Sequence, residues 1–278
     1  MKHLNKPKFD VKEIVNNCAE SYKDKQLKNN FITSSEFIKS ESAKYDLSAQ
    51  HGEWDIFKQH DMVNNILTKE NMKSLYNDKF VGNHKIKSKY YDKIMVSTTT
   101  CPICGIGQVS NLDHYLAKSL YPTYSVTPIN LIPICRECNY KKRDDAITNI
   151  KNAPLNPYYD DVDNIIWLKA SLKLEHNVLN AIYSVNNKLQ TTDNTLYYRR
   201  QHHLNIYKLP TLYTSQASVE IAEHTELWKS LLQKNKNRFK KHLQDSLHSY
   251  EKIQKNTWKT ALYRALIENF YLTEQYLS

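Results

Sequence analysis

Two Cys-x-x-Cys pairs mark the part of this chain where the types and spacing of side chains could support chemistry. Cys101 and Cys104 form the first pair, and Cys135 and Cys138 form the second. Two such turns supply the four soft ligands that a tetrahedral zinc ion needs. The chain has five cysteines, so only Cys18 is left over, which indicates a reduced compartment and a closed structural zinc site rather than a disulfide framework. A redox role is disfavoured, because redox Cys-x-x-Cys motifs normally stand alone.

Polar residues that a purely structural finger would not need lie between and beside the pairs. Asp113 and His114 are adjacent, Asn130 follows in the same segment, and Asn139 comes directly after the last cysteine. Carboxylate and amide oxygens are hard ligands that suit Mg²⁺ or Mn²⁺. A histidine beside such an ion, with a pKa near neutral, can accept a proton from water. These are the parts of a one-metal phosphodiesterase.

Three basic residues near the second cysteine pair are candidates for holding a phosphate backbone. Arg136 precedes Asn139 by three positions and Arg143 follows it by four, so a helix would place all three on one face. Lys142 lies between that face and the side on which Cys135 and Cys138 would hold the metal. A charged side chain in this position can hold a phosphate by charge-assisted hydrogen bonds.

A small irregular segment must position these side chains. The chain has only four glycines and eight prolines, and two of the glycines and four of the prolines lie between residues 101 and 143. We expect a strand over roughly 107–114, a loop to Asn130, a second strand over residues 131–134 and a short helix from near Cys135. The hairpin would end its first strand at Asp113-His114 and would bring the two cysteine pairs together.

The flanking regions, which are poor in glycine and proline, are predicted to be mainly helical. Asp10 is placed to cap a first helix, and further helices are expected over 35–46 and 68–80. Apolar residues recur at helical spacing in the first of these helices: Val11, Ile14, Val15, Cys18 and Tyr22. Cys18 is therefore interpreted as a small buried hydrophobic residue rather than a nucleophile.

The region after the second cysteine pair combines a turn, a hairpin and helices. Residues 155–162, LNPYYDDV, predict a turn that docks on the central segment, with a second acidic site as the alternative. Alternation of apolar and polar residues predicts a short β-hairpin near 165–185. Basic residues of a later helical stretch are candidate contacts for a nucleic-acid backbone, with a solvated helix face as the alternative: Lys234, Lys236, Arg238, Lys240 and Lys241.

The overall charge points to a polyanionic partner. The net charge is +10 and the isoelectric point is about 9.1, which favours nucleic acid as that partner. The N-terminus lacks the apolar core of a signal peptide, and no apolar run approaches the length needed to span a membrane. We expect a soluble, cytoplasmic protein with no membrane partner.

The pattern Cys-x-x-Cys, Asp-His, Asn-Leu, Cys-x-x-Cys-Asn-x-x-Lys resembles the HNH family of ββα-metal endonucleases, in the variant stapled by zinc. The resemblance covers residues 101–144. It implies a mainly α protein with a small central ββα-metal finger, divided into a helical region over 1–95, the finger over 96–150 and a mainly helical region over 151–278. More loosely, the segments LDHYLAKSLYP and LNPYYDDV resemble those of bacterial HNH proteins associated with phage defence or mobile elements.

The resemblance also implies a role for each central residue. His114 would be the general base, Asp113 and Asn139 would bind the catalytic Mg²⁺ or Mn²⁺, and Lys142 would belong to the catalytic set. Asn130 would brace the loop that orients His114. The third position of the motif is often histidine and is asparagine here, a departure that the family tolerates. The expected activity is hydrolysis of double-stranded DNA that leaves 5′-phosphate and 3′-hydroxyl ends.

Two alternatives remain open from the sequence. A zinc finger with a vestigial site would bind nucleic acid or a protein partner tightly and in a salt-sensitive way, without turnover. A nuclease of the same kind could instead cut RNA, because such a finger grips the backbone and reads little sequence. Control by a regulatory partner such as an ATPase or a sensor protein would involve the helical regions.

Overall fold

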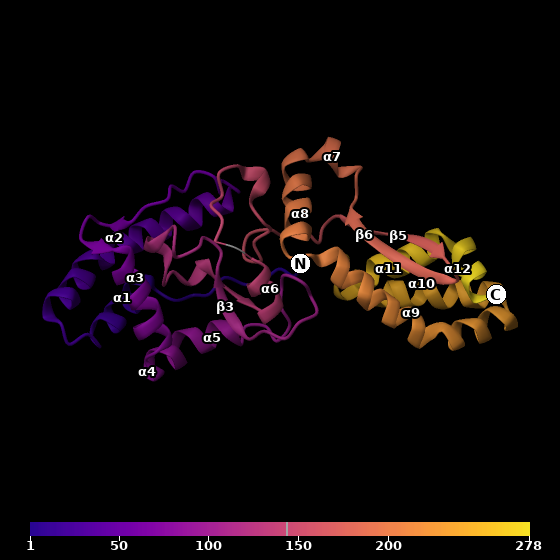
Figure 1. Ribbon diagram of the computed structural model, residues 1–278, viewed down its shortest axis with the longest axis horizontal. Helices are drawn as coiled ribbons and strands as arrows, with labels where there is room; N and C mark the ends of the chain where they lie inside the picture. Colours follow the sequence, from indigo (N-terminus) through magenta and orange to yellow (C-terminus); the bar gives the residue numbers. More distant parts are fainter. Residues whose placement is uncertain (143) are drawn as a thin grey trace. The chain divides into compact units, whose positions relative to one another are not determined.

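The computed structural model describes residues 1–142 and 144–278, so the predicted phosphate contact Arg143 lies outside the described residues. The chain divides into two compact units. The N-terminal unit is His3–Asp160, and the C-terminal unit combines Met1–Lys2 with Asp161–Ser278. Each is mainly helical with small two-stranded antiparallel sheets, as the sequence predicts (Figure 1). None of the helices in the described residues is both long and apolar enough to cross a lipid bilayer.

The first two helices of the N-terminal unit form where the sequence places them. Helix α1 spans Val11–Ala19, and the Asp10 side chain caps it by accepting a hydrogen bond from the backbone N–H of Lys12. Helix α2 spans Lys25–Gln50 and contains the predicted stretch 35–46. The apolar face of α1 is buried, including Cys18. Tyr22 lies beyond the end of α1 and is only partly buried, so it extends the apolar face without belonging to the helix.

The predicted helix over 68–80 forms as two consecutive pieces with different geometry. Thr68 caps α3, and the chain then widens into the π-helical segment η1. Single π-helical turns are uncommon and often occur at functional sites. The elements of this region are β1 (Met62–Val63), β2 (Leu67–Thr68), α3 (Lys69–Ser74), η1 (Leu75–Val81), α4 (His84–Ile86), the π-helical η2 (Lys87–Tyr91) and α5 (Asp92–Met95).

A hairpin followed by a short helix forms the centre of the N-terminal unit. Strand β3 (Asn111–His114) pairs antiparallel with β4 (Leu131–Ile134), and the register sets Asp113 opposite Ile132. Two short 3₁₀ helices, η3 (Pro122–Tyr124) and η4 (Pro128–Asn130), shape the connection, and α6 (Arg136–Lys141) follows β4. The second strand has the predicted bounds.

The first strand of this hairpin is shorter than the predicted 107–114. Residues 107–109 are hydrogen-bonded to the chain just before the first knuckle instead of extending β3. The backbone N–H of Cys101 donates to the carbonyl of Gly107 at 2.8 Å, and that of Val109 donates to the carbonyl of Thr99 at 3.0 Å. This pairing closes the first cysteine turn, which a longer β3 could not do.

The hairpin and the N-terminal helices share one hydrophobic core. Leu112, Val126 and Leu131 from the central segment lie in the same buried cluster as Ile14 of α1 and Phe31 of α2. The predicted turn at 155–162 also docks on the hairpin. The Tyr158 hydroxyl donates to the backbone carbonyl of Leu131 in β4 at 2.8 Å. The short η5 (Ile150–Asn152) precedes that turn.

The C-terminal unit contains the predicted hairpin, which packs against helices. Strands β5 (Leu168–Glu175) and β6 (Val178–Val185) pair antiparallel, and α9 and α11 pack against them. Phe239, Leu243, Leu262 and Leu266 are buried, and Phe270 begins a separate final helix. The helices are α7 (Leu189–Thr192), α8 (Asn194–Ile206), α9 (Leu209–Lys234), α10 (Lys236–Ile253), α11 (Trp258–Glu268) and α12 (Phe270–Leu277).

Candidate metal centre and active-site cleft

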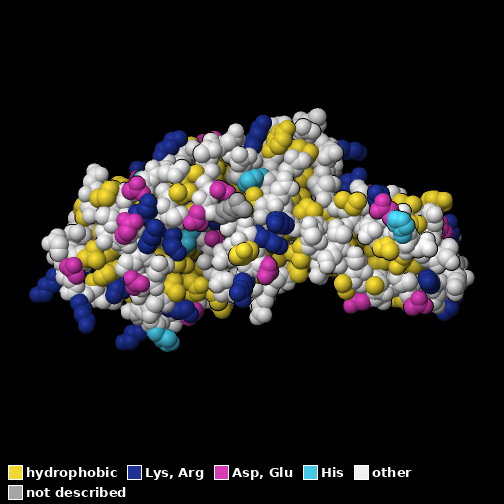
Figure 2. Space-filling view, viewed as in Figure 1, with side chains coloured by type: hydrophobic (Ala, Val, Ile, Leu, Met, Phe, Trp, Pro, Cys, Tyr) yellow, Lys and Arg dark blue, Asp and Glu magenta, His cyan; other side chains and the backbone are white. Residues whose placement is uncertain are grey.

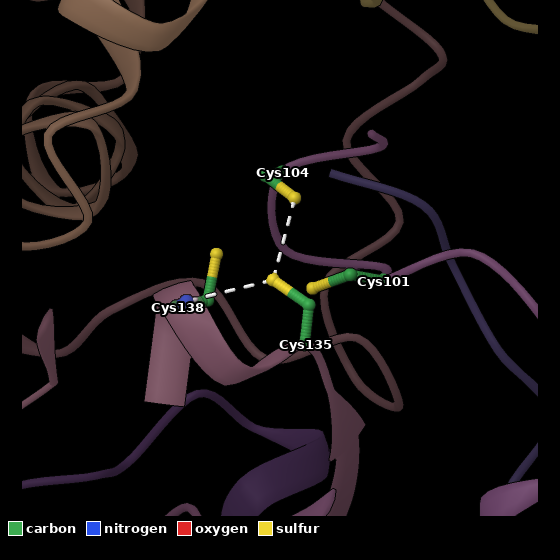
Figure 3. Close-up of side chains that lie close together, drawn as sticks. All are labelled: Cys101, Cys104, Cys135 and Cys138. Atoms are coloured by element: carbon green, nitrogen blue, oxygen red, sulfur yellow. Dashed lines mark hydrogen bonds between the residues drawn. The ribbon is translucent and has the colours of Figure 1, made fainter. Parts of the chain in front are cut away.

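The four paired cysteines converge on one point. Their sulfur atoms all lie within 4.8 Å of one another, all four side chains are buried, and none is in a disulfide. Figure 3 shows Cys101 and Cys104 approaching from the first knuckle, and Cys135 and Cys138 from the start of α6. The Sγ atoms of Cys104 and Cys135 are 3.9 Å apart. Zn–S bonds of about 2.3 Å in a tetrahedron require S···S separations of about 3.8 Å, so the four thiols could hold a zinc ion.

Two glycines and a helix cap allow this convergence. Gly105 has a φ of +70°, a left-handed conformation that the turn after Cys104 requires. A Cβ at Gly107 would lie 2.8 Å from both Cβ and Sγ of Cys135, so only glycine lets the two knuckles approach. Cys135 caps α6, and its Sγ accepts from the backbone N–H of Cys138 at 3.5 Å. Such N–H···S bonds stabilise thiolates.

Beside this cluster, the hairpin and α6 form a cleft. It has a volume of about 500 Å³, and residues of β3, α6 and the loop after β3 line it. Asp113, His114 and Asn139, which the sequence analysis selected for catalysis, all lie on its wall. The structure therefore brings these three side chains to one place, Asp113 and His114 from β3 and Asn139 from α6.

His114 is held in a defined tautomer. The ring is buried, and its Nε2 lies 2.8 Å from the backbone carbonyl oxygen of Ser125. Since a carbonyl only accepts, Nε2 carries the proton, and Nδ1 keeps its lone pair. Burial lowers the pKa of His114 to about 3, and the nearby positive charges of Lys118 and Lys142 act in the same direction. The imidazole is consequently neutral at physiological pH.

The side chain of Lys142 binds to two groups of strand β3. Its Nζ forms an ion pair with Oδ2 of Asp113 at 2.7 Å, and both side chains are largely buried, with exposures of 10% and 18%. The same ammonium donates a hydrogen bond to the backbone carbonyl of His114. Lys142 thus ties the chain after α6 to the end of β3, and it neutralises the carboxylate of Asp113.

Asn130 holds the loop between β3 and β4 from inside. Its side chain is fully buried, its Oδ1 accepts from the backbone N–H of Leu116 at 2.8 Å, and its Nδ2 donates to the carbonyls of Leu116 at 3.0 Å and Tyr124 at 3.1 Å. The Tyr45 hydroxyl of α2 donates to Oδ1 at 3.2 Å. These bonds fix both ends of the loop that carries Ser125, the acceptor for His114.

The residues predicted to contact phosphate lie in both units and do not all line the cleft. Arg136 is exposed on α6, and Asn139 is half-buried at the cleft. The distal basic residues lie on α9 and α10 of the C-terminal unit, all exposed. Two of them have acidic partners, Lys236 with Glu274 at 2.7 Å and Lys241 with Asp245 at 2.9 Å. Figure 2 shows basic and acidic side chains interspersed on the face in view.

Sequence reasoning missed one wall of the cleft. Tyr76 and Asn77 of η1 line it together with Lys118. The rings of Tyr76 and His114 meet edge-on with centroids 4.4 Å apart, and the Lys118 Nζ lies 4.4 Å from the centre of the Tyr76 ring. Tyr76 lies within the predicted helical stretch 68–80, where it is buried and also lines the cleft. Lys118 could have been selected from the sequence, because it is a basic residue only four positions after His114.

Comparison with known proteins finds a relative in a bacteriophage. Protein ea31 of Escherichia phage lambda is 34% identical to this chain over 170 residues. The match covers 58% of this chain and 57% of the phage protein, so the chain spans little more than half of its relative's length. No family model matches the chain. No solved structure matches it either.

Proposed function

We propose that the chain is a metal-dependent endonuclease of the HNH type that hydrolyses DNA phosphodiester bonds. The observation that carries this proposal is the convergence of Asp113, His114 and Asn139 on one cleft beside the four-cysteine cluster. A hairpin and a short helix supply these residues, which is the arrangement that a ββα-metal finger requires. The cysteine cluster would hold zinc in a structural role, joining the two ends of the finger.

The donor set at the cleft fits a hard divalent cation. Asp113 offers a carboxylate and Asn139 an amide oxygen, and the Asn139 side chain has no hydrogen-bond partner within residues 1–142 and 144–278. When bound there, Mg²⁺ or Mn²⁺ would supply Lewis-acid stabilisation of charge on the phosphate and the leaving oxygen. Lys142 would have to share or release the carboxylate of Asp113 for this to happen.

The protein's own residues supply the proton transfer. His114 is neutral, and the carbonyl of Ser125 fixes its Nε2–H, so Nδ1 is the atom that would take a proton from water. Asn130 keeps that carbonyl in place by closing the loop. Lys142 holds the backbone of His114 against the end of α6. General-base catalysis of this kind contributes about 10²–10⁴-fold to a rate.

The Lys142–Asp113 ion pair also favours a second candidate, a nucleic-acid-binding module with a vestigial site. A carboxylate that is already neutralised by a largely buried ammonium is a weaker metal ligand. This protein would bind zinc and nucleic acid without metal-dependent turnover. RNA would be the alternative substrate if turnover occurs but DNA remains intact.

The phage relative supports a mobile-element setting. Protein ea31 belongs to a bacteriophage, and its name states no activity. We infer that this chain acts on DNA in phage or mobile-element biology, either as an element's own nuclease or in defence against one.

Plasmid cleavage tests the proposal. Purified protein is incubated with supercoiled DNA in Mg²⁺, Mn²⁺ or EDTA, beside His114→Ala and the control His84→Ala, which changes an exposed histidine outside the cleft. We expect metal-dependent nicking or linearisation by wild type and His84→Ala, and none by His114→Ala, with zinc content equal in all three. Full activity of His114→Ala refutes the assignment, and zinc-loaded protein that shifts DNA without cutting it supports the binding module.

A further inference from the structure

Two lysines reach the cleft region, and their environments differ. The ammonium of Lys142 is taken up by Asp113 and by the backbone carbonyl of His114. The ammonium of Lys118 has no hydrogen bond or ion pair in the part of the chain that the structure describes, and it lies over the face of the Tyr76 ring. Asp144, the second acidic residue of the cleft wall besides Asp113, accepts a hydrogen bond from the Ser119 hydroxyl at 2.7 Å. Lys118 therefore keeps three donors available.

The position of Lys118 is fixed from both sides. Asn130 binds both the N–H and the carbonyl of Leu116, two residues before Lys118, so the backbone there is anchored. Tyr76 is buried against Phe80, with stacked ring centroids 5.7 Å apart, and its ring carries the Lys118 ammonium. A cation over an aromatic face is attracted by the ring quadrupole, more strongly when it is partly desolvated.

The burial of Lys118 makes an anion favourable in this cleft. The side chain is half-buried, and burial lowers its pKa, with the charges of Asp144 and Asp113 opposing that shift and Lys73 adding to it. A partly desolvated ammonium with unused donors gains from a charge-assisted hydrogen bond to an anionic oxygen. Because Tyr76 contacts His114 as well as Lys118, an anion held by Lys118 would lie near His114, the proposed general base.

We propose that Lys118 is a phosphate-binding residue of the cleft, which holds a non-bridging oxygen of the phosphodiester beside His114, and that Tyr76 is the residue that positions it. This inference rests on the proposed nuclease function and assigns to Lys118 a role that Lys142 cannot perform while it is paired with Asp113. The ligand class is the phosphodiester of a nucleic-acid backbone.

A binding assay without cleavage tests this proposal. In a His114→Ala background, affinity for a 5′-labelled DNA duplex is measured over a range of salt concentrations with Lys118→Met, Lys118→Arg and the control Lys58→Met, which removes an exposed charge elsewhere. Losing one phosphate contact should weaken binding about tenfold and lower the slope of log K against log [salt] by about 0.9. Lys118→Arg should restore both values, and Lys58→Met should change neither.

Tyr76 is tested in the same assay. Tyr76→Phe keeps the ring and should preserve affinity and salt slope, whereas Tyr76→Leu should weaken binding in the same direction as Lys118→Met. Zinc content and hydrogen exchange of the N-terminal unit show that each variant is folded. If Tyr76→Leu does not fold, the Lys118 series still decides the proposal.

The outcomes separate this inference from the nuclease proposal. Unchanged affinity and slope in Lys118→Met, or no binding of the duplex by the His114→Ala protein, overturns the phosphate site. Wild-type plasmid cleavage is scored in parallel, so a protein that cuts DNA while Lys118→Met binds normally remains a nuclease without this contact. A protein that never cuts but loses affinity and slope in Lys118→Met keeps the phosphate site and loses the nuclease.

Discussion

Replacing Asn130 with alanine tests whether this residue is a structural brace. The substitution removes four hydrogen bonds to buried groups: the N–H and carbonyl of Leu116, the carbonyl of Tyr124 and the hydroxyl of Tyr45. The Tyr124 carbonyl keeps a second donor, the N–H of Thr127 at 3.2 Å, and the Tyr45 hydroxyl can rotate. The two groups of Leu116 are left without a partner. Each such buried group costs about 1–3 kcal/mol, so we expect a loss of about 4 kcal/mol.

Two further substitutions serve as comparisons for the loss of stability expected in Asn130→Ala. Tyr45→Phe removes one neutral hydrogen bond of 3.2 Å and leaves Asn130 bonded to Leu116, so it should cost only about 0.5–1.5 kcal/mol. Asn139→Ala removes a half-buried side chain without hydrogen bonds in the described chain and should change stability by less than about 0.5 kcal/mol. Substitutions of the two asparagines should therefore have different effects: Asn130→Ala should lower stability, and Asn139→Ala should weaken metal binding.

Urea unfolding followed by hydrogen exchange measures the changes in stability of the N-terminal unit, which contains all three substituted residues. Of the four tryptophans only Trp54 lies within residues 3–160, so total fluorescence would mix the two units. With a urea m-value of about 2 kcal/mol per molar, Asn130→Ala should shift the midpoint of peptides from the N-terminal unit by about 2 M. A shift no larger than that of Tyr45→Phe would refute the reasoning.

Three other predictions concern the cysteines and the distal basic residues. We expect elemental analysis to find zinc in the wild-type protein and none in Cys135→Ser. The variant should also unfold at a lower temperature, because metal binding is part of the folding free energy; zinc retained by Cys135→Ser would contradict the four-thiol site. Burial raises the pKa of Cys18 to about 12, so native protein should not be alkylated at Cys18 at pH 8. The contribution of the neutral thiol to the free energy of unfolding should be complete below about pH 9 and should be lost as the pH rises toward 12. Rapid alkylation of folded protein would show that Cys18 is accessible. Substituting Lys234, Arg238 and Lys240 with glutamate should weaken DNA binding and reduce its salt dependence, measured by titration at several salt concentrations, whereas unchanged binding would leave these residues as a solvated face.

The elements that the sequence predicts well have local causes. The cysteine pairs indicate which chain segments meet, because four thiols that could hold one metal ion must lie within a few ångströms of one another. The Asp10 cap and the apolar spacing after it define α1. The alternation after residue 165 defines the hairpin of the C-terminal unit. In each case the signal lies within a few residues of the structure it specifies.

The features that the sequence does not predict depend on contacts between distant segments. Gly107 belongs to the cysteine turn rather than to β3, because it must pass close to Cys135. The ion pair of Lys142 with Asp113 depends on how α6 meets the hairpin. Tyr76 lines the cleft from the π-helical segment η1, and no residue pattern in 68–80 distinguishes that segment from an α-helix.

The helical region therefore contributes to the candidate site as well as to the core. Tyrosines from three of its segments contact the central segment: Tyr45 of α2 bonds to Asn130, Tyr76 of η1 contacts His114, and the Tyr91 hydroxyl of η2 accepts from the backbone N–H of Leu112 at 3.2 Å. These contacts involve His114 itself, Asn130, which holds the loop that carries the His114 acceptor, and Leu112, two positions before His114 in β3. Since hydroxyls and ring edges have narrow geometric requirements, a small displacement of these helices would move the imidazole and the loop that carries its acceptor. Any ligand or partner that shifts the N-terminal helices would thereby alter the geometry of the cleft, without touching Asp113 or the cysteine cluster.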